Sequence, residues 1–110
     1  METISLQSVT DANLEAAATN PGGHSATTVY GGSGHRLRQT LLALTAGSAL
    51  SEHTTAGEAT LFVLDGTVRI DAGQRSWEAA TGDLVAVPAG PHSLHALETS
   101  VLLLTVALPG

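Results

Sequence analysis

The chain has 110 residues, and its four arginines, absent lysines and ten acidic residues give it a formal net charge of −6. This length suits one domain, and the charge argues against nucleic acid and against an anionic membrane surface as partners. The absence of cysteine excludes disulfides and thiolate chemistry. Only 13% of residues are charged whereas 43% are hydrophobic, so we expect a homodimer that covers an apolar face.

The N-terminal residues lack the basic and apolar regions of a secretion signal. The longest apolar run, Val101–Leu104, is far too short to cross a membrane. We therefore expect a cytoplasmic protein. Further along, Thr10 or Asp11 can cap a short helix over Ala12–Ala18, which Asn20 and the following Pro-Gly-Gly would end.

The rest of the chain reads as short strands separated by turn residues. Asp65-Gly66 is a hairpin signal, because glycine accepts a positive φ without penalty. Regularly spaced short strands with turns between them are typical of an all-β sandwich or barrel. The predicted strands cover residues 25–30, 37–45, 50–55, 59–64, 67–71, 75–79, 84–87, 92–97 and 100–107.

The segment Gly47–Gly66 resembles the first signature of the cupin family. That signature runs Gly, five residues, His-x-His, three or four residues, Glu, six residues, Gly. His53 matches its first histidine, but Thr55 occupies the position of the second. Ala59 occupies the position of the metal-binding glutamate, and Glu58 lies one residue out of register.

A second segment is similar to the other cupin signature, which runs Gly, five residues, Pro-x-Gly, two residues, His, three residues, Asn. Gly82, Pro88 and Gly90 match it. His92 follows Gly90 after one residue instead of two, and Ala96 stands where the family has asparagine. The glycines and proline of the signature turns are therefore retained, while only two histidines remain of the metal ligands.

The resemblance, which covers about residues 37–107, is to small single-domain bacterial cupins of the RmlC-like kind. It implies an all-β double-stranded β-helix, the jelly-roll barrel, with a short N-terminal helix. The division it suggests is an N-terminal helical arm over residues 1–24 and a cupin barrel over residues 25–110. An exposed edge strand needs covering, so residues 25–30 are the candidate to cross to a partner subunit.

In the family's barrel, the two signatures bring their histidines together inside one end. His53 and His92 are therefore the candidate metal ligands, for a divalent Fe, Mn, Zn or Ni ion. Such ions normally take three or four protein ligands, and Thr55 is a poor one. Glu58 would complete a two-His-one-carboxylate site only if a bulge at Ala56-Gly57 turned it inward; otherwise it is a solvated charge at a strand end.

Several other side chains have two interpretations. The candidate ligand pocket comprises His53, Thr55, His92 and Gln39, where Gln39 either offers its amide to a ligand or satisfies backbone at a sheet edge. His95 falls on the opposite strand face from His92 and is expected at the surface or an interface. His24 and His35 lie in glycine-rich loops and are expected to be solvated.

Three functions remain open on the sequence. The favoured one is a binding module that holds a small organic molecule in the barrel cavity, with a degenerate metal site and no required cofactor. The second is a metal-dependent oxygenase or isomerase that uses His53 and His92, together with Glu58 if that side chain turns inward. The third is a structural protein that binds a partner through its outer sheets. Whether the protein is an enzyme is left open, because a fold does not fix a function.

Overall fold

The computed structural model describes residues 1–109, and these form one helix and nine strands. The elements in chain order are α1 (Leu6–Thr19), β1 (His24–Tyr30), β2 (Leu37–Leu44), β3 (Ala49–His53), β4 (Glu58–Asp65), β5 (Thr67–Ala72), β6 (Arg75–Ala80), β7 (Leu84–Ala86), β8 (His92–Ala96) and β9 (Ser100–Ala107). All nine predicted strands are present, with boundaries that differ by at most two residues.

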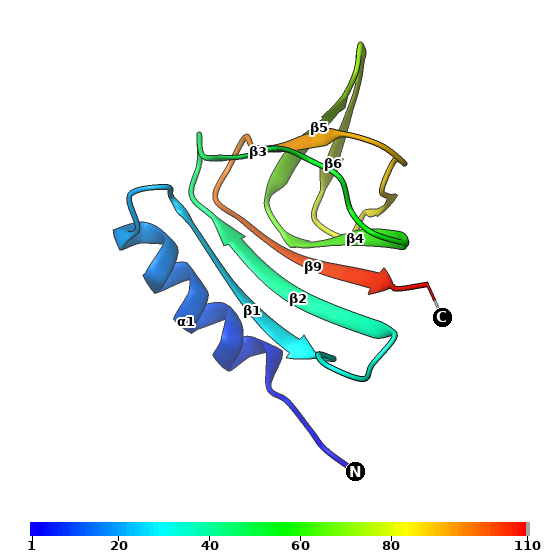
Figure 1. Cartoon of the computed structure of the whole chain (residues 1–110). Helices are drawn as coiled ribbons and strands as arrows, with labels where there is room; N and C mark the ends of the chain where they lie inside the picture. The colour runs from blue at the N-terminus through cyan, green and yellow to red at the C-terminus, as the bar shows by residue number, and fades with distance from the viewer. Residues whose placement is uncertain (110) are drawn as a thin grey trace.

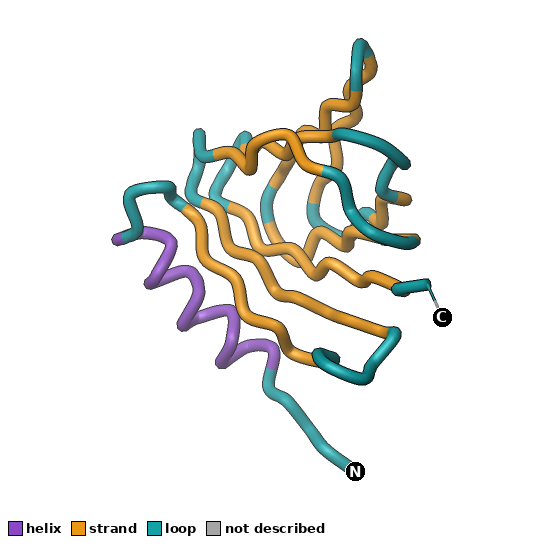
Figure 2. The backbone as a smooth tube through the Cα atoms, viewed as in Figure 1, coloured by secondary structure: helices purple, strands orange, loops and turns teal. Residues whose placement is uncertain are grey.

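The strands form two antiparallel sheets that face each other (Figures 1 and 2). The larger sheet has the order β1-β2-β9-β4-β7, and the smaller has the order β3-β8-β5-β6. Neighbours in each sheet are often distant in the chain, as β9 between β2 and β4 illustrates. This arrangement confirms the predicted all-β jelly roll with a short N-terminal helix.

The hydrophobic core lies between the two sheets. Successive strand residues point to opposite faces, so alternate positions along each strand reach this interior. Leu44, Val63 and Leu102 of the larger sheet are fully buried there, as is Val68 of the smaller one. Fully burying a side chain of this size stabilises the fold by about 1.5–3 kcal/mol.

The helix begins earlier than the sequence analysis predicted. Ser5, instead of Thr10 or Asp11, is the N-cap, and its Oγ accepts a hydrogen bond from the Ser8 amide at 3.2 Å. A serine at the N-cap satisfies one of the free amides of the first turn. The helix therefore begins about one and a half turns before the predicted start at Ala12. Its buried positions are Asn13 and Ala17, one turn apart.

Helix α1 packs against β1 and β2 on the outer face of the larger sheet (Figure 1). Asn13 fastens it there, because its Nδ2 donates to Thr27 Oγ1 at 2.8 Å and its Oδ1 accepts from Ser25 Oγ at 2.7 Å. Strand β1 pairs only with β2 and forms one edge of this sheet. The crossing of this strand to a partner subunit stays a prediction.

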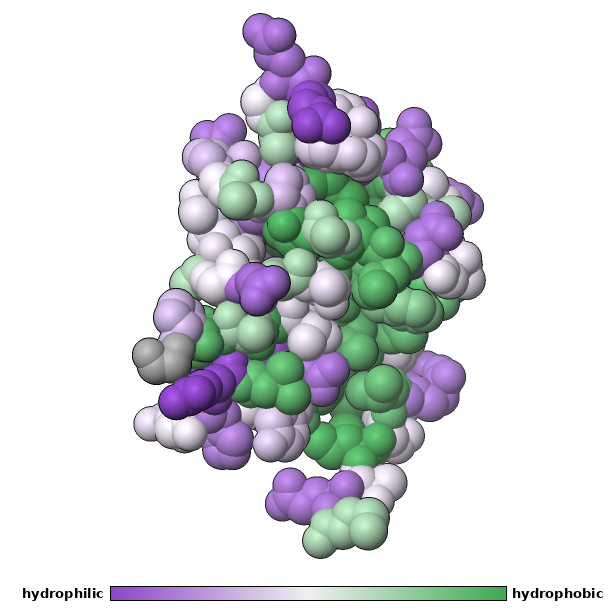
Figure 3. All heavy atoms as spheres, turned by 90° about the vertical axis from the view of Figure 1, so that its right-hand side faces the viewer, coloured by the Kyte–Doolittle hydropathy of each residue, from purple (hydrophilic) through white to green (hydrophobic). Residues whose placement is uncertain are grey.

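Hydrophobic side chains also reach the surface. In the space-filling view of Figure 3 they gather in a band that runs down one face, with polar side chains on either side of it. Leu84 of the edge strand β7 is 64% exposed, and Leu37 and Tyr30 are exposed as well. The homodimer expected from the composition stays a prediction. Within residues 1–109, no helix is long and apolar enough to traverse a lipid bilayer.

Candidate functional site

A cavity of about 120 Å³ lies between the sheets at one end of the barrel. Both sheets contribute to its wall, and nine of its twelve lining residues are apolar. The apolar residues are Leu42, Leu50, Leu61, Ile70, Val85, Val87, Pro88, Leu94 and Leu104, and the polar ones are His53, Thr55 and His92. This combination of an apolar wall and a few convergent polar groups is typical of small-molecule sites.

His53 and His92 lie side by side on this wall. They are direct partners in the antiparallel pairing of β3 with β8, and their ring centroids are 4.6 Å apart. His92 is the inner member, at 5% exposure, while His53 is exposed at the rim. The two candidate ligands that the sequence analysis placed in one barrel end therefore meet there.

An irregularity in β3 brings His53 to the cavity. Leu50 pairs with Leu94 and His53 pairs with His92, so three steps along β3 correspond to two along β8. In a regular strand, residues 50 and 53 would lie on opposite faces. The extra residue of a bulge restores the inward orientation, and both side chains line the cavity.

Backbone carbonyls orient both imidazoles. His53 Nδ1 donates to the Ser51 carbonyl oxygen at 2.8 Å, and His92 Nδ1 donates to the Gly90 carbonyl oxygen at 3.0 Å. A carbonyl oxygen only accepts, so the proton lies on Nδ1 in each neutral ring. Each Nε2 is left as an acceptor. A histidine that ligates a metal is commonly held in the same way.

Thr55 and Glu58 lie near the rim of the cavity. Thr55 lines both the cavity and an adjoining surface groove that also contains Glu58. Glu58 is the first residue of β4, and the pairing of β4 with β9 is regular from Glu58 to Val63. Because Leu61 points into the cavity, the alternation places Glu58 on the outer face of this sheet.

Gln39 lies elsewhere. It belongs to β2, where Leu42 points into the cavity, so Gln39 is on the outer face. Its Nε2 donates to Thr105 Oγ1 of β9 at 3.2 Å. Gln39 lines a separate surface groove beside Tyr30 and the N-terminal residues.

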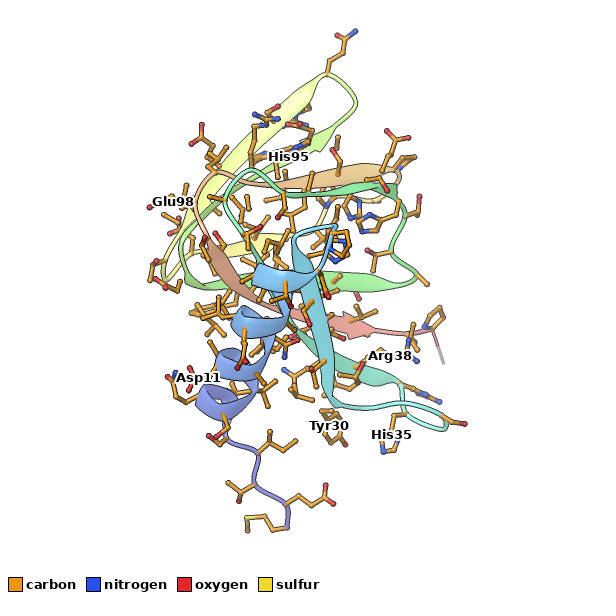
Figure 4. The ribbon with its side chains drawn as sticks, turned by 90° about the vertical axis from the view of Figure 1, so that its left-hand side faces the viewer. Asp11, Tyr30, His35, Arg38, His95 and Glu98 are labelled. Carbon is orange, nitrogen blue, oxygen red and sulfur yellow. The ribbon has the colours of Figure 1, made fainter. Side chains whose placement is uncertain are left out.

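The remaining histidines are also outside the cavity. His35 lies with Tyr30 and Arg38 at one end of the molecule, with its ring 5.5 Å from that of Tyr30, whereas His95 lies toward the other end (Figure 4). His24 begins β1. His95 is on the outer face of the smaller sheet, as expected, and its Nε2 is 3.2 Å from Asp71 Oδ2.

Asp71 is the centre of a polar network on that outer face. It accepts hydrogen bonds from Ser76 Oγ at 2.6 Å and from Arg69 Nε at 3.1 Å. These two hydrogen bonds, with smaller contributions from the charges of Arg69 and His95, hold the pKa of the Asp71 carboxyl below its ordinary value. This face is polar and has no part in the cavity.

The donor set does not fit the family's metal site. Among residues 1–109, no three His, Cys, Asp or Glu side chains are grouped so that they could share an ion. His53 and His92 supply two imidazoles, Thr55 and Ala59 occupy the other ligand positions, and Glu58 faces away. First-row metal sites in proteins normally use three or four protein ligands, so the residues present do not make one.

The apolar lining was not predicted residue by residue. A usable signal existed, because the strand alternation shared with the buried core shows which positions of β2, β4 and β9 face inward. Leu42, Leu61 and Leu104 follow from that alternation. Thr55, which was predicted, is the only hydroxyl among the lining residues.

Comparisons with known proteins identify the fold family. Residues 40–107 match the family model described as a cupin domain. A comparison with curated proteins found no match. A conserved protein of unknown function from Streptococcus pyogenes has a similar structure, with a TM-score of 0.73, 28% sequence identity, and coverage of 83% of this chain and 79% of that one.

Two further solved structures are similar. A cupin superfamily protein from Desulfitobacterium hafniense has a TM-score of 0.71 at 17% identity, and 78% of each chain is covered. Salicylate 1,2-dioxygenase from Pseudoaminobacter salicylatoxidans, solved with gentisate, has a TM-score of 0.74 at 23% identity, and the match covers 89% of this chain but only 31% of the enzyme. At these identities the likeness concerns the fold alone. The cupin family model matches more than half of the residues of this chain, and the chain therefore belongs to the cupin family.

Proposed function

We propose that this protein binds a small organic molecule in the barrel cavity, with His53 and His92 as the polar anchors. The observation that carries the proposal is the pair of neighbouring imidazoles, oriented by backbone carbonyls, on a predominantly apolar wall. Because His92 is buried and lines the cavity while His53 is exposed at its rim, a ligand held there can hydrogen-bond to both rings.

Thermal-shift screening against small phenols, alcohols, acids and sugars tests this proposal. A ligand that binds only the folded protein stabilises it by about 2.7 kcal/mol at 100 times its Kd. For a domain of this size that corresponds to a rise in melting temperature of roughly 10 °C or more. We expect such a rise for at least one apolar compound that fits the cavity.

Adjacent residues of β9 offer a matched pair of variants for this screen. Leu104 lines the cavity, whereas Leu103 lies on the opposite strand face, and both are half-buried. Leu104→Phe should fill the cavity and abolish the ligand-induced shift, while Leu103→Phe should keep it. A shift that survives equally in both variants, or no shift with any compound, would contradict the proposal.

Metal analysis separates this function from the metal-dependent oxygenase or isomerase. Protein purified without an affinity tag, loaded with Fe, Mn, Zn or Ni and then dialysed, should retain much less than one ion per chain, because two imidazoles are too few ligands. Stoichiometric metal that is lost in the His53→Ala, His92→Ala double variant would instead support the enzyme.

A further inference from the structure

We propose that the cavity selects a small hydroxylated molecule with an apolar body about the size of one six-membered ring. The ligand's hydroxyl group donates to Nε2 of His92, with the exposed His53 beside it at the mouth. This inference rests on the proposed function and narrows it to one class of ligand. It follows from the hydrogen-bonding state of the imidazoles, the charge of the wall and the size of the cavity.

The imidazoles require a donor from the ligand. Both Nδ1 atoms already donate to backbone carbonyls, so each neutral ring presents Nε2 as an acceptor. No group of residues 1–109 hydrogen-bonds to His92 Nε2 in the structure, and no buried side-chain nitrogen or oxygen of those residues is without a partner. Nε2 of the otherwise buried His92 must therefore be accessible, and the cavity that His92 lines is where a donor can reach it.

The wall excludes charged ligands. It contains no arginine and no carboxylate, and the chain as a whole carries a net charge of −6. Beside neutral imidazoles, a carboxylate ligand would lose its hydration without gaining a cationic partner, which is strongly unfavourable. The wall also has only three polar residues, so a sugar would leave most of its hydroxyl groups unpaired.

The volume limits the apolar body of the ligand. The cavity measures about 120 Å³. An engineered cavity of about 150 Å³ with a comparable aliphatic lining accepts benzene, so one six-membered ring is the scale that fits. A phenol or a cyclic alcohol combines this size with one donor, and Thr55 at the rim can accept or donate a further hydrogen bond.

Phenol and toluene are the matched probes, because they have nearly the same shape and toluene carries a methyl group where phenol carries its hydroxyl. Isothermal titration calorimetry of each compound with the wild-type protein measures the two affinities. Their ratio shows whether the cavity supplies a hydrogen-bond partner for the hydroxyl. Phenol loses more hydration on binding, so without a partner it should bind about tenfold more weakly than toluene or worse. We expect phenol to bind at least as tightly as toluene, and benzoate and glucose to show no binding at the same concentrations.

His92→Leu and His95→Leu form the matched variants, because the two histidines are on opposite faces of β8. Phenol should bind the His92→Leu variant about tenfold more weakly than toluene does. The His95→Leu variant should preserve the wild-type order of the two affinities. If His92→Leu does not fold, the comparison of phenol with toluene in the wild-type protein still tests the proposal.

The outcomes distinguish a wrong ligand class from the absence of a binding cavity. A wild-type cavity that prefers toluene tenfold, or one that binds benzoate more tightly than phenol, overturns the proposed ligand class but leaves a binding cavity. An order of affinities that a folded His92→Leu variant leaves unchanged also overturns it. The absence of binding by every probe overturns the proposed function itself.

Discussion

His53 and His92 face each other across the β3–β8 pairing, and their rings meet edge to face with an interplanar angle of 60°. The irregularity between Leu50 and His53 makes this contact possible, because it turns both side chains of β3 to the same face. The two signature segments thus contribute one imidazole each to neighbouring positions on a wall that is otherwise apolar except for Thr55.

The turn between β4 and β5 depends on Gly66. Its φ is +103°, and a Cβ at this position would collide with Ser100 Oγ and lie 2.6 Å from the Thr99 carbonyl oxygen. Gly66→Ala should therefore lower the free energy of unfolding by about 3 kcal/mol, through backbone strain and overpacking together. Urea denaturation measures this loss.

Gly73 provides the control for that variant. Its φ is +60°, but a Cβ there would meet no atom within 4 Å. Gly73→Ala should cost only about 1 kcal/mol, for the left-handed backbone conformation alone. Equal losses in the two variants would show that the close approach to Ser100 is not what requires glycine at position 66.

The helix is held to the sheet by the buried amide of Asn13. Asn13→Ala removes hydrogen bonds to Thr27, Ser25 and the Val9 carbonyl, and should lower the free energy of unfolding by about 1–3 kcal/mol. Gln7→Ala removes an exposed hydrogen bond within the same helix and should change the free energy of unfolding by less than about 0.5 kcal/mol. Denaturant unfolding measures both, and a neutral Asn13→Ala would mean that α1 is not docked through this amide.

We expect the stability of the protein to depend on pH through the carboxylate of Asp71. Hydrogen bonds from Ser76 and Arg69 lower its pKa in the folded state below the ordinary value of about 3.9. A lowered pKa stabilises the folded state above that ordinary value, and the contribution disappears as the pH falls through the folded-state pKa. The difference in unfolding free energy between wild type and Asp71→Asn should thus be full near pH 6 and shrink below pH 4. A difference that stays constant down to pH 2 would contradict this account.

Much of the fold could be predicted from the sequence because its turns carry strong local signals. Glycine and proline mark nearly every strand boundary, and the nine predicted strands agree with those observed. The start of the helix was placed wrongly because the capping serine, Ser5, precedes a turn with weak amphipathic character.

The candidate site was less predictable because it depends on which face each side chain takes. Alternation alone left open whether Gln39 points inward, and only the pairing of β2 with β9 places it outside. Likewise, the sequence left open a bulge at Ala56-Gly57 and gave no sign of the irregularity of β3 between Leu50 and His53. The proton positions on the two imidazoles follow from carbonyl contacts that no sequence pattern reveals.

Long-range nitrogen–proton NMR spectra of the histidine rings, recorded during a titration with phenol, test the binding account most directly. We expect His53 and His92 to carry their proton on Nδ1 in the free protein, and the Nε2 resonance of His92 to shift along a single saturation curve while those of His24, His35 and His95 stay unchanged. Protons on Nε2 in the free protein, or phenol binding that leaves His92 unaffected, would contradict it.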